Sequence, residues 1–253
     1  MSVGDFIIQT DRLSKAFQGF VAVNNVDLRI RRHTIHALIG PNGAGKSTVF
    51  NLITKFLQPT GGSILYNGRD ITRVTPARVA RMGMVRSFQI SSVFPHLTVL
   101  QNVRVALQRS LGTSFHFWRS SQSLDRLNDR VRELLADVDL SAFENTPAAE
   151  LSYGRKRVLE LAMTLALEPE VMLLDEPMAG MGVEDVQRTA DLIRRAARGR
   201  TVLMVEHNIS VVADLSDTIT VLQRGHILAE GTYAEVSADR DVIAAYMGGS
   251  DDV

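Results

Sequence analysis

A chain of 253 residues has room for one or two domains, and its 45% hydrophobic residues are enough to bury a sizeable core. The 28 basic and 28 acidic residues cancel, so the composition gives no general reason to bind nucleic acid or an anionic membrane. The absence of cysteine excludes disulfides, Cys-ligated zinc and iron–sulfur clusters. The sequence has no apolar run of membrane-spanning length and no secretory signal, so we expect a soluble cytoplasmic protein.

Short strands are expected near the start of the chain. Residues 26–30 alternate between apolar and charged side chains, and residues 34–39 form an apolar run typical of a buried strand. After a glycine-rich stretch, apolar residues recur at helical spacing over residues 49–57. Asn67-Gly68 then predicts a tight hairpin turn.

The middle of the chain has a different character. Leucine and valine residues over 124–135 lie on one helical face, whereas Ser110–Ser123 is polar with no clear period and is expected to be a loop or a short irregular helix. Strands predicted at 171–174 and 202–205 flank a helix at 186–197, and Arg224-Gly225 marks a later hairpin. The pattern is that of an α/β core interrupted by a helical insertion.

The most specific motif is Gly40-Pro41-Asn42-Gly43-Ala44-Gly45-Lys46-Ser47, which fits G-x-x-x-x-G-K-[ST] between an expected strand and an expected helix. Its glycines let backbone N–H groups surround phosphate oxygens, and the positive end of the helix strengthens that field. We expect Lys46 to bridge the β- and γ-phosphates and the Ser47 hydroxyl to bind Mg²⁺. The loop, taken through Thr48, predicts a nucleoside triphosphate site.

Two acidic residues end the apolar strand predicted at 171–174. Asp175 and Glu176 lie at its carboxyl end, the edge where ligands bind in open α/β sheets. We expect Asp175 to hold Mg²⁺, directly or through water, and Glu176 to polarise the attacking water. By itself the acidic pair is not specific, because an apolar strand that enters a solvated loop has the same pattern. Its functional interpretation depends on the phosphate loop in the same chain. Together the two motifs leave kinases, GTPases and motor ATPases open.

Further features narrow the class. Leu151-Ser152-Tyr153-Gly154 precedes the acidic pair, Gln89 lies between the two motifs, and His207 follows the last apolar strand. In this order the motifs resemble those of the ATP-binding subunits of ABC transporters. The chain is similar to the subgroup that imports branched-chain amino acids, urea and short amides at residues 151–154, 176–181, 206–208 and 242–248.

The resemblance implies an α/β fold: a P-loop NTPase core of the RecA-like type, an antiparallel β subdomain and an inserted α-helical subdomain. It covers a single domain over residues 6–248. Within it we expect the core to comprise 6–88 and 160–248, and the helical subdomain about 89–159.

The resemblance also implies roles for single residues. Phe17 is at the position where an aromatic ring stacks on adenine, with Phe20 as the rival residue. Gln89 would contact Mg²⁺ and the attacking water, and His207 would contact the γ-phosphate. The implied cofactors are therefore ATP and Mg²⁺.

Ser152 and Gly154 would face the γ-phosphate of ATP held by a second ATP-binding subunit, so that two chains close head to tail around two nucleotides.

Two residues depart from the family pattern. Arg155 replaces the usual Gln or Glu, and Gly182 replaces the usual Asp or Asn. Neither belongs to the groups expected to hold Mg²⁺ or water, so we expect hydrolysis with altered cooperativity between the two sites.

The implied function is an ATPase that powers an importer from the inner face of the cell membrane. Its partners would be membrane-spanning permease subunits, an identical or related ATP-binding subunit and, indirectly, a solute-binding protein. Phe94-Pro95-His96-Leu97 lies where the family receives a coupling helix, although these residues also suit the subdomain's own core. The alternatives are a lipopolysaccharide-export ATPase, a soluble ABC protein of DNA repair or translation, and a P-loop kinase.

Overall fold

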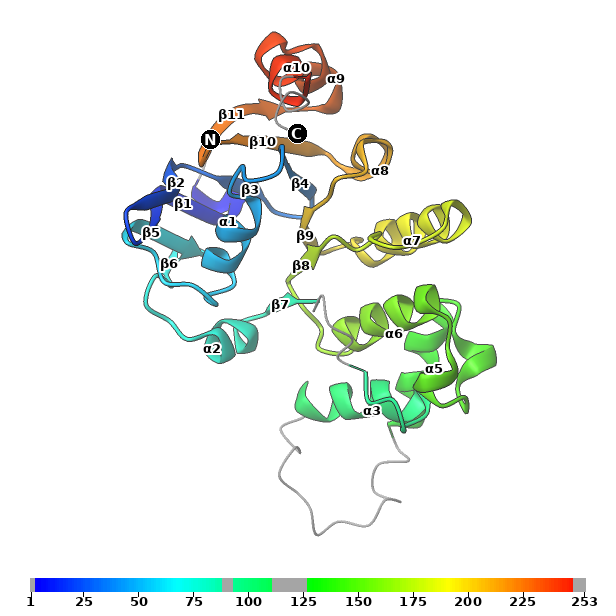
Figure 1. The fold of residues 1–253 in the computed structure, drawn as a ribbon. Coiled ribbons are helices and arrows are strands. Elements are labelled where there is room, and N and C mark those ends of the chain that lie inside the picture. Colours follow the sequence, from blue (N-terminus) through cyan, green and yellow to red (C-terminus); the bar gives the residue numbers. More distant parts are fainter. Residues whose placement is uncertain (1–2, 88–92, 111–126, 248–253) are drawn as a thin grey trace.

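The computed structural model describes residues 3–87, 93–110 and 127–247, and a mixed β-sheet lies at its centre (Figure 1). The strands of this sheet are β4 (Ile35–Ile39), β7 (Met84–Arg86), β8 (Val171–Asp175), β9 (Thr201–Val205), β10 (Thr218–Gln223) and β11 (His226–Gly231). In these ranges they form a six-stranded sheet in the order β11-β10-β4-β9-β8-β7. Pairing is parallel from β10 to β7, and β11 joins antiparallel to β10.

A second, antiparallel sheet is built from the first part of the chain. Its strands are β1 (Phe6–Phe17), β2 (Phe20–Val26), β3 (Arg29–Arg31), β5 (Gly61–Tyr66) and β6 (Arg69–Asp70). Their order is β2-β1-β5-β6, and β3 pairs with β1. The predicted turn at Asn67-Gly68 joins β5 to β6, and both residues have positive φ, as a primed hairpin turn requires.

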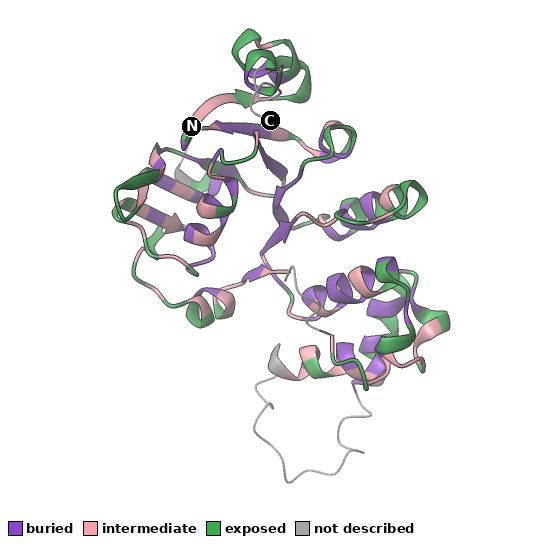
Figure 2. Ribbon diagram, viewed as in Figure 1, coloured by how far each residue is buried: buried purple, intermediate pink, exposed green. Residues whose placement is uncertain are grey.

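The central sheet is covered on both faces, so every residue of β4, β8 and β9 is buried (Figure 2). On one face, Ala37 and Ile39 of β4 belong to a hydrophobic cluster that includes α7 (Val183–Ala196) and α8 (Ile209–Leu215). On the other face, Leu38 packs in a cluster with α1 (Lys46–Ile53) and the antiparallel sheet. Burial on both faces explains why these strands are mostly apolar in the sequence, with His36, Asp175 and Thr201 as their polar residues.

The helical insertion lies to one side of the central sheet and consists of α3 (Val99–Ser110), α5 (Asn128–Asp137) and the start of α6 (Tyr153–Leu165) (Figure 1). Because α6 continues past residue 159, the expected boundary falls inside a helix, and its position stays a prediction. The remaining helices are α2 (Pro76–Arg81), α9 (Tyr233–Ala238) and α10 (Arg240–Met247), with 3₁₀ turns at Val3–Asp5, Ser141–Phe143 and Ala148–Glu150. Among the described residues, no helix combines the length and hydropathy needed to span a bilayer.

Two predicted elements differ from the observed ones. The helix expected over 49–57 ends at Ile53, because Lys55 adopts φ 66° and turns the chain, which leaves Phe56 53% exposed. The strand expected over 26–30 is divided between the end of β2 and the start of β3, although Leu28 between them is buried. The α/β core, the antiparallel sheet and the helical insertion are confirmed, while most of Ser110–Ser123 lies outside the described residues.

Candidate functional site

The phosphate loop, residues 40–48, connects the central strand β4 to α1. Gly40 and Gly45 have φ values of 147° and 102°. A Cβ atom on Gly40 would lie 2.2 Å from the carbonyl oxygen of Leu222, and one on Gly45 would lie 2.6 Å from that of Ala22. Side chains therefore cannot fit at either position, and the loop is fixed between β10 and β2.

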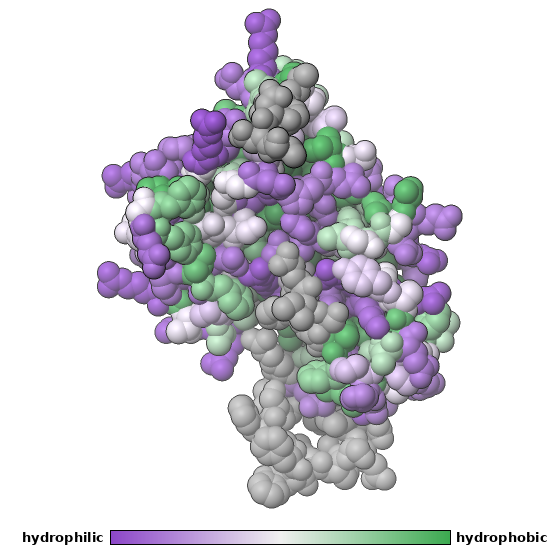
Figure 3. Space-filling view, in the orientation of Figure 1, coloured by the Kyte–Doolittle hydropathy of each residue, from purple (hydrophilic) through white to green (hydrophobic). Residues whose placement is uncertain are grey.

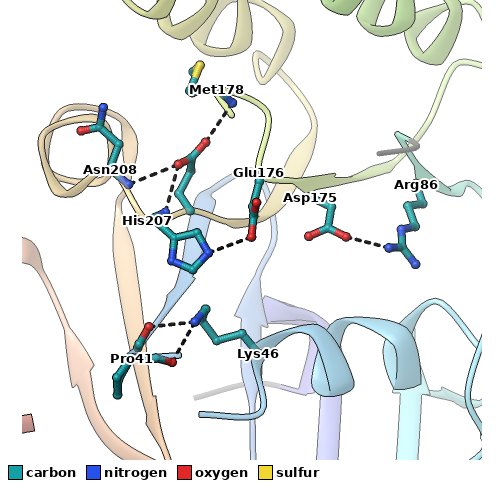
Figure 4. A network of polar contacts seen from close by, with 10 residues as sticks. Pro41, Lys46, Arg86, Asp175, Glu176, Met178, His207 and Asn208 are labelled. Atoms are coloured by element: carbon teal, nitrogen blue, oxygen red, sulfur yellow. Dashed lines mark hydrogen bonds and ion pairs between the residues drawn. The ribbon is translucent and has the colours of Figure 1, made fainter. Parts of the chain in front are cut away.

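Lys46 is the first residue of α1, and its side chain is buried beneath the loop. Its Nζ donates hydrogen bonds to the carbonyl oxygens of Gly40 at 2.8 Å and Pro41 at 3.0 Å (Figure 4). Burial lowers the pKa of Lys46, and the negative charge of Glu176 partly offsets that effect. The lysine thus lies in the electrostatic field of the carboxylate expected to act on water.

The acidic pair lies at the carboxyl end of β8, as predicted, but its two members have different partners. Asp175 is buried, and its Oδ2 is 2.6 Å from Nη2 of Arg86. Glu176 adopts φ 47°, a left-handed conformation that few residues other than glycine adopt. Its Oε1 lies 2.7 Å from Nε2 of His207 (Figure 4). The fold therefore joins Glu176 to His207 and Asp175 to an arginine at the end of β7.

Glu206 is a site residue for which the sequence argument gave no role. It is 4% exposed and directly follows β9. Its Oε1 accepts a hydrogen bond from the backbone N–H of Met178 at 3.0 Å, and its Oε2 accepts from the N–H of His207 at 3.0 Å and of Asn208 at 3.3 Å. One buried carboxylate thus holds both the loop after Glu176 and the chain at His207. The available signal was a charged residue directly after the apolar run at 202–205.

Ser152 and Gly154 lie at the start of α6. The Ser152 side chain is the N-cap and accepts a hydrogen bond from the N–H of Arg155 at 3.4 Å. A Cβ atom on Gly154 would lie 2.9 Å from Oδ2 of Asp185, so a side chain there would push into α7. None of the described contacts joins Ser152 or Gly154 to the phosphate loop or to Glu176.

The structure shows the surroundings of Arg155 and Gly182, the two residues that depart from the family pattern. The guanidinium of Arg155 stacks on the ring of Phe143 with 4.1 Å between its Cζ and the ring centroid. Gly182 is the N-cap of α7 and has no side chain to cap the helix. A Cβ atom there would meet nothing within 4 Å, so the position has room for a side chain.

Phe17 ends β1 and pairs with Phe20 across the β1–β2 turn. Phe17 is 41% and Phe20 is 67% exposed, and Nζ of Lys15 lies 5.0 Å from the centroid of the Phe17 ring. Figure 3 shows apolar side chains gathered over the part of the molecule where Figure 1 places β1, β2 and β5. Both rings are accessible, so the choice of stacking residue between them stays a prediction.

Gln89, which was expected to contact Mg²⁺ and the attacking water, lies outside the described residues, whereas the loop expected to receive a coupling helix is described. Phe94 is 48% exposed, in a loop held by the fully buried Asn102. Nδ2 of Asn102 donates to the carbonyl oxygens of Phe94, Leu97 and Thr98, and its Oδ1 accepts from the N–H of Phe94. This interior amide fixes the shape of the loop while leaving Phe94 at the surface.

A groove of about 620 Å³ runs between the central sheet and the helical insertion. It is mostly apolar and is lined by side chains from α2, β7, α3 and α6, with Phe56 and Arg86 among them. Arg86 therefore lines the groove and also pairs with Asp175.

The donor set at the end of β8 fits Mg²⁺, which prefers oxygen ligands and keeps several waters. Oδ1 of Asp175 is buried and has no hydrogen-bond partner among the described residues. The hydroxyl-bearing Ser47 follows Lys46 in the first turn of α1 and is exposed. Within the same ranges no group of three His, Cys, Asp or Glu residues could hold a metal by protein ligands alone. This is the pattern expected of a cation shared with phosphate oxygens.

Comparison with known proteins gives two family matches. A family model described as ABC transporter matches residues 23–179, and one described as Branched-chain amino acid ATP-binding cassette transporter matches residues 226–252. The second match does not favour the alternative of a lipopolysaccharide-export ATPase.

Similar whole chains are also known. The high-affinity branched-chain amino acid transport ATP-binding protein BraF of Pseudomonas aeruginosa is 37% identical over 249 residues, covering 96% of this chain and 98% of its own. LivG of Escherichia coli, with the same description, is 38% identical with the same coverage. The ADP conformation of MJ1267, an ATP-binding cassette of an ABC transporter, has a TM-score of 0.82 at 28% identity, covering 96% of this chain and 99% of its own.

Proposed function

The chain belongs to the ABC transporter family of ATP-binding subunits, and we propose that it hydrolyses ATP to power an importer of branched-chain amino acids or related small amides. The observation that carries the hydrolytic part is the contact of 2.7 Å between Glu176 and His207, in the electrostatic field of Lys46. The solute class is inferred from the C-terminal match and from the names of the two relatives.

The first step is nucleotide binding by the phosphate loop. The backbone N–H groups of the phosphate loop surround the phosphates, and Lys46 exchanges its two loop carbonyl acceptors for β- and γ-phosphate oxygens. Phe17 stacks on the adenine ring, which suits its accessible position. Ser47, Asp175 and Gln89 would hold Mg²⁺, which when bound would neutralise charge on the phosphates.

In hydrolysis, Glu176 is the residue that polarises the attacking water. His207 orients that carboxylate and contacts the γ-phosphate, and Glu206 fixes the backbone on both sides of the pair. Gln89 contributes to positioning the water. These roles divide the work between a general base and groups that hold it in place.

The complete site needs a second ATP-binding subunit. Ser152 and Gly154 begin α6, whose N–H groups can bind a phosphate oxygen of ATP held by the partner. Two subunits would then close head to tail around two ATP molecules. The dimer works at the inner face of the membrane with permease subunits, which dock near Phe94–Leu97, and indirectly with a solute-binding protein.

The decisive experiment uses Glu176→Gln, which keeps the shape of the side chain but removes its charge. ATP binding should survive while hydrolysis falls by about 100-fold, the usual scale for loss of a general base. Uncleaved ATP should then shift the variant from monomer to dimer in gel filtration, because it stabilises only the closed form. ADP, which lacks the γ-phosphate, should not produce the shift.

The matched control adds Ser152→Ala to Glu176→Gln. This double variant should still bind ATP, because Ser152 serves the partner's nucleotide, but it should remain monomeric. Since the partner is either an identical or a related subunit, the same experiment is repeated with the related subunit added. A monomer under every condition would contradict the head-to-tail arrangement and with it the proposed function.

A further inference from the structure

Arg86, at the end of β7, places a positive charge at the carboxylate expected to hold Mg²⁺. Its Nη2 lies 2.6 Å from Oδ2 of Asp175, and its Nη1 donates to Oδ1 of Asn51 at 2.6 Å. The side chains of Arg86 and Asp175 are 15% and 4% exposed. A charge pair this well shielded from water is only weakly screened by salt.

Aromatic rings hold the guanidinium from the side of α1. The Cζ atom of Arg86 lies 4.9 Å from the ring centroid of Phe50 and 5.2 Å from that of Phe56. Stacking on ring faces is favourable for a guanidinium. The arginine is thus fixed at Asp175 by an ion pair, an amide acceptor and two aromatic rings.

The pair leaves two buried polar atoms unsatisfied. Oδ1 of Asp175 and Nε of Arg86 have no hydrogen-bond partner among the described residues. An orphaned carboxylate oxygen and an orphaned guanidinium N–H each cost free energy when buried. The pairing is therefore incomplete, and the carboxylate keeps a free oxygen for a stronger cation.

The arginine also borders an open groove. Arg86 lines the groove of about 620 Å³ beside the helical insertion, whereas Asp175 is not among the residues that line it, so space for the arginine side chain lies close by. Mg²⁺ loses its hydration water reluctantly, so by itself it competes poorly with a guanidinium already in place. With a nucleotide in the loop, phosphate oxygens supply the remaining ligands and favour the divalent ion.

We propose that Arg86 is a positioning residue that occupies Asp175 in the nucleotide-free chain and yields to Mg²⁺ when nucleotide binds, so that it sets the Mg²⁺ concentration the site requires. The proposal rests on the proposed nucleotide site. It predicts that removing the guanidinium charge strengthens Mg²⁺ binding without strengthening binding of the nucleotide itself.

The test measures ADP binding by calorimetry over a series of Mg²⁺ concentrations and in EDTA, in wild type and in Arg86→Met. ADP avoids both hydrolysis and dimer formation. The Mg²⁺ concentration for half-maximal enhancement of ADP affinity should fall about tenfold in Arg86→Met, because close buried charge pairs are coupled at least that strongly. ADP affinity in EDTA should change less than twofold.

Two further variants keep the result interpretable. Arg86→Lys keeps the charge but loses the second hydrogen bond and the stacking, so its Mg²⁺ midpoint should fall by a smaller factor, and it serves as the test if Arg86→Met does not fold. Arg32→Met removes a similar ion pair, 2.8 Å from Glu170 at the opposite end of the strands, and should leave the Mg²⁺ midpoint unchanged.

The outcomes separate this proposal from the proposed function. A wild-type chain that does not bind ADP with Mg²⁺ overturns the nucleotide site itself. A wild-type chain with the expected Mg²⁺ dependence, and an Arg86→Met chain with an unchanged or higher midpoint, overturns only the role of Arg86. Loss of ADP affinity in EDTA would instead make Arg86 a phosphate ligand, which also overturns the proposal.

Discussion

The carboxylate of Glu206 accepts a hydrogen bond from the backbone N–H of Met178 at 3.0 Å, and this contact ties the end of β9 to the loop after β8. The same side chain accepts from the N–H groups of His207 and Asn208. Three backbone donors thus converge on one buried carboxylate. Through them, Glu206 fixes the relative position of the two chain segments that carry Glu176 and His207.

Replacing Glu206 with Gln should lower stability and hydrolysis together. An amide offers one acceptor oxygen and one NH₂ group, so at least one backbone N–H would face another donor. Leaving such a buried donor unsatisfied costs about 2 kcal/mol in the free energy of unfolding, which urea denaturation measures. Nucleotide affinity should stay within a few-fold of wild type, because the phosphate loop is untouched.

Glu235→Gln provides the matched control for that variant. The Glu235 carboxylate also accepts a backbone N–H, that of Thr232 at 2.7 Å, but in an exposed capping box on α9. This control should leave both stability and hydrolysis near wild type. Equal effects in the two variants would mean that Glu206 has no special place in the site.

Lys46→Ala should weaken binding of ADP and ATP at least about 100-fold, since charged hydrogen bonds to two phosphates are lost. The measurement is calorimetric titration of the monomer. Lys156→Ala is the control. Lys156 lies near the start of α6 and donates to the carbonyl oxygen of Ala149, away from the phosphate loop, so this variant should bind nucleotide normally. Affinity of Lys46→Ala within a few-fold of wild type would contradict the assigned phosphate loop.

Gly182→Asp should raise stability slightly and change the cooperativity of ATP hydrolysis. An aspartate at the N-cap of α7 can accept a helix N–H, and the position has room for it, so we expect a gain of about 0.5 kcal/mol in the free energy of unfolding. The Hill coefficient for ATP should change more than the maximal rate, because Gly182 lies outside the catalytic groups.

Arg155→Gln is the companion variant at the other departure from the family pattern. It removes the stacking on Phe143 and should also change the Hill coefficient more than the maximal rate. If both variants keep the wild-type Hill coefficient while the maximal rate changes tenfold, these positions do not lie at the dimer seam.

His36 should make the fold less stable in mild acid. It is buried in β4, and burial lowers its pKa to about 4. Its ordinary pKa is about 6.5, so the unfolded chain binds a proton that the folded chain does not as the pH falls between these values. The free energy of unfolding therefore keeps its full value above about pH 6.5 and falls on acidification. Between pH 7.5 and pH 5 the loss due to His36 is about 2 kcal/mol.

The test of this pH dependence is His36→Gln. The hydroxyl of Thr220 donates to Glu230, so Nε2 of His36 is the donor to Thr220 at 2.8 Å, and an amide can replace that donor without ionising. Urea denaturation of the variant at the two pH values should show about 2 kcal/mol less acid destabilisation than wild type. An identical loss in both proteins would exclude His36 as its source.

The sequence by itself determined the phosphate loop, the acidic pair and the order of strands and helices around them. These features depend on residues that are close along the chain. A strand buried on both faces is mostly apolar, as in β4, β8 and β9, and the close approach of β10 and β2 to the phosphate loop requires glycine at Gly40 and Gly45. Local spacing is enough to reveal such constraints.

Only the tertiary structure decided which groups from distant parts of the chain meet. Met178 and Glu206 are 28 residues apart in sequence, Glu176 and His207 are 31 apart, and Arg86 and Asp175 are 89 apart. These contacts arise because parallel strands bring distant chain segments to one edge of the sheet. Charged residues at strand ends look alike in the sequence, and the geometry at that edge assigns each its partner.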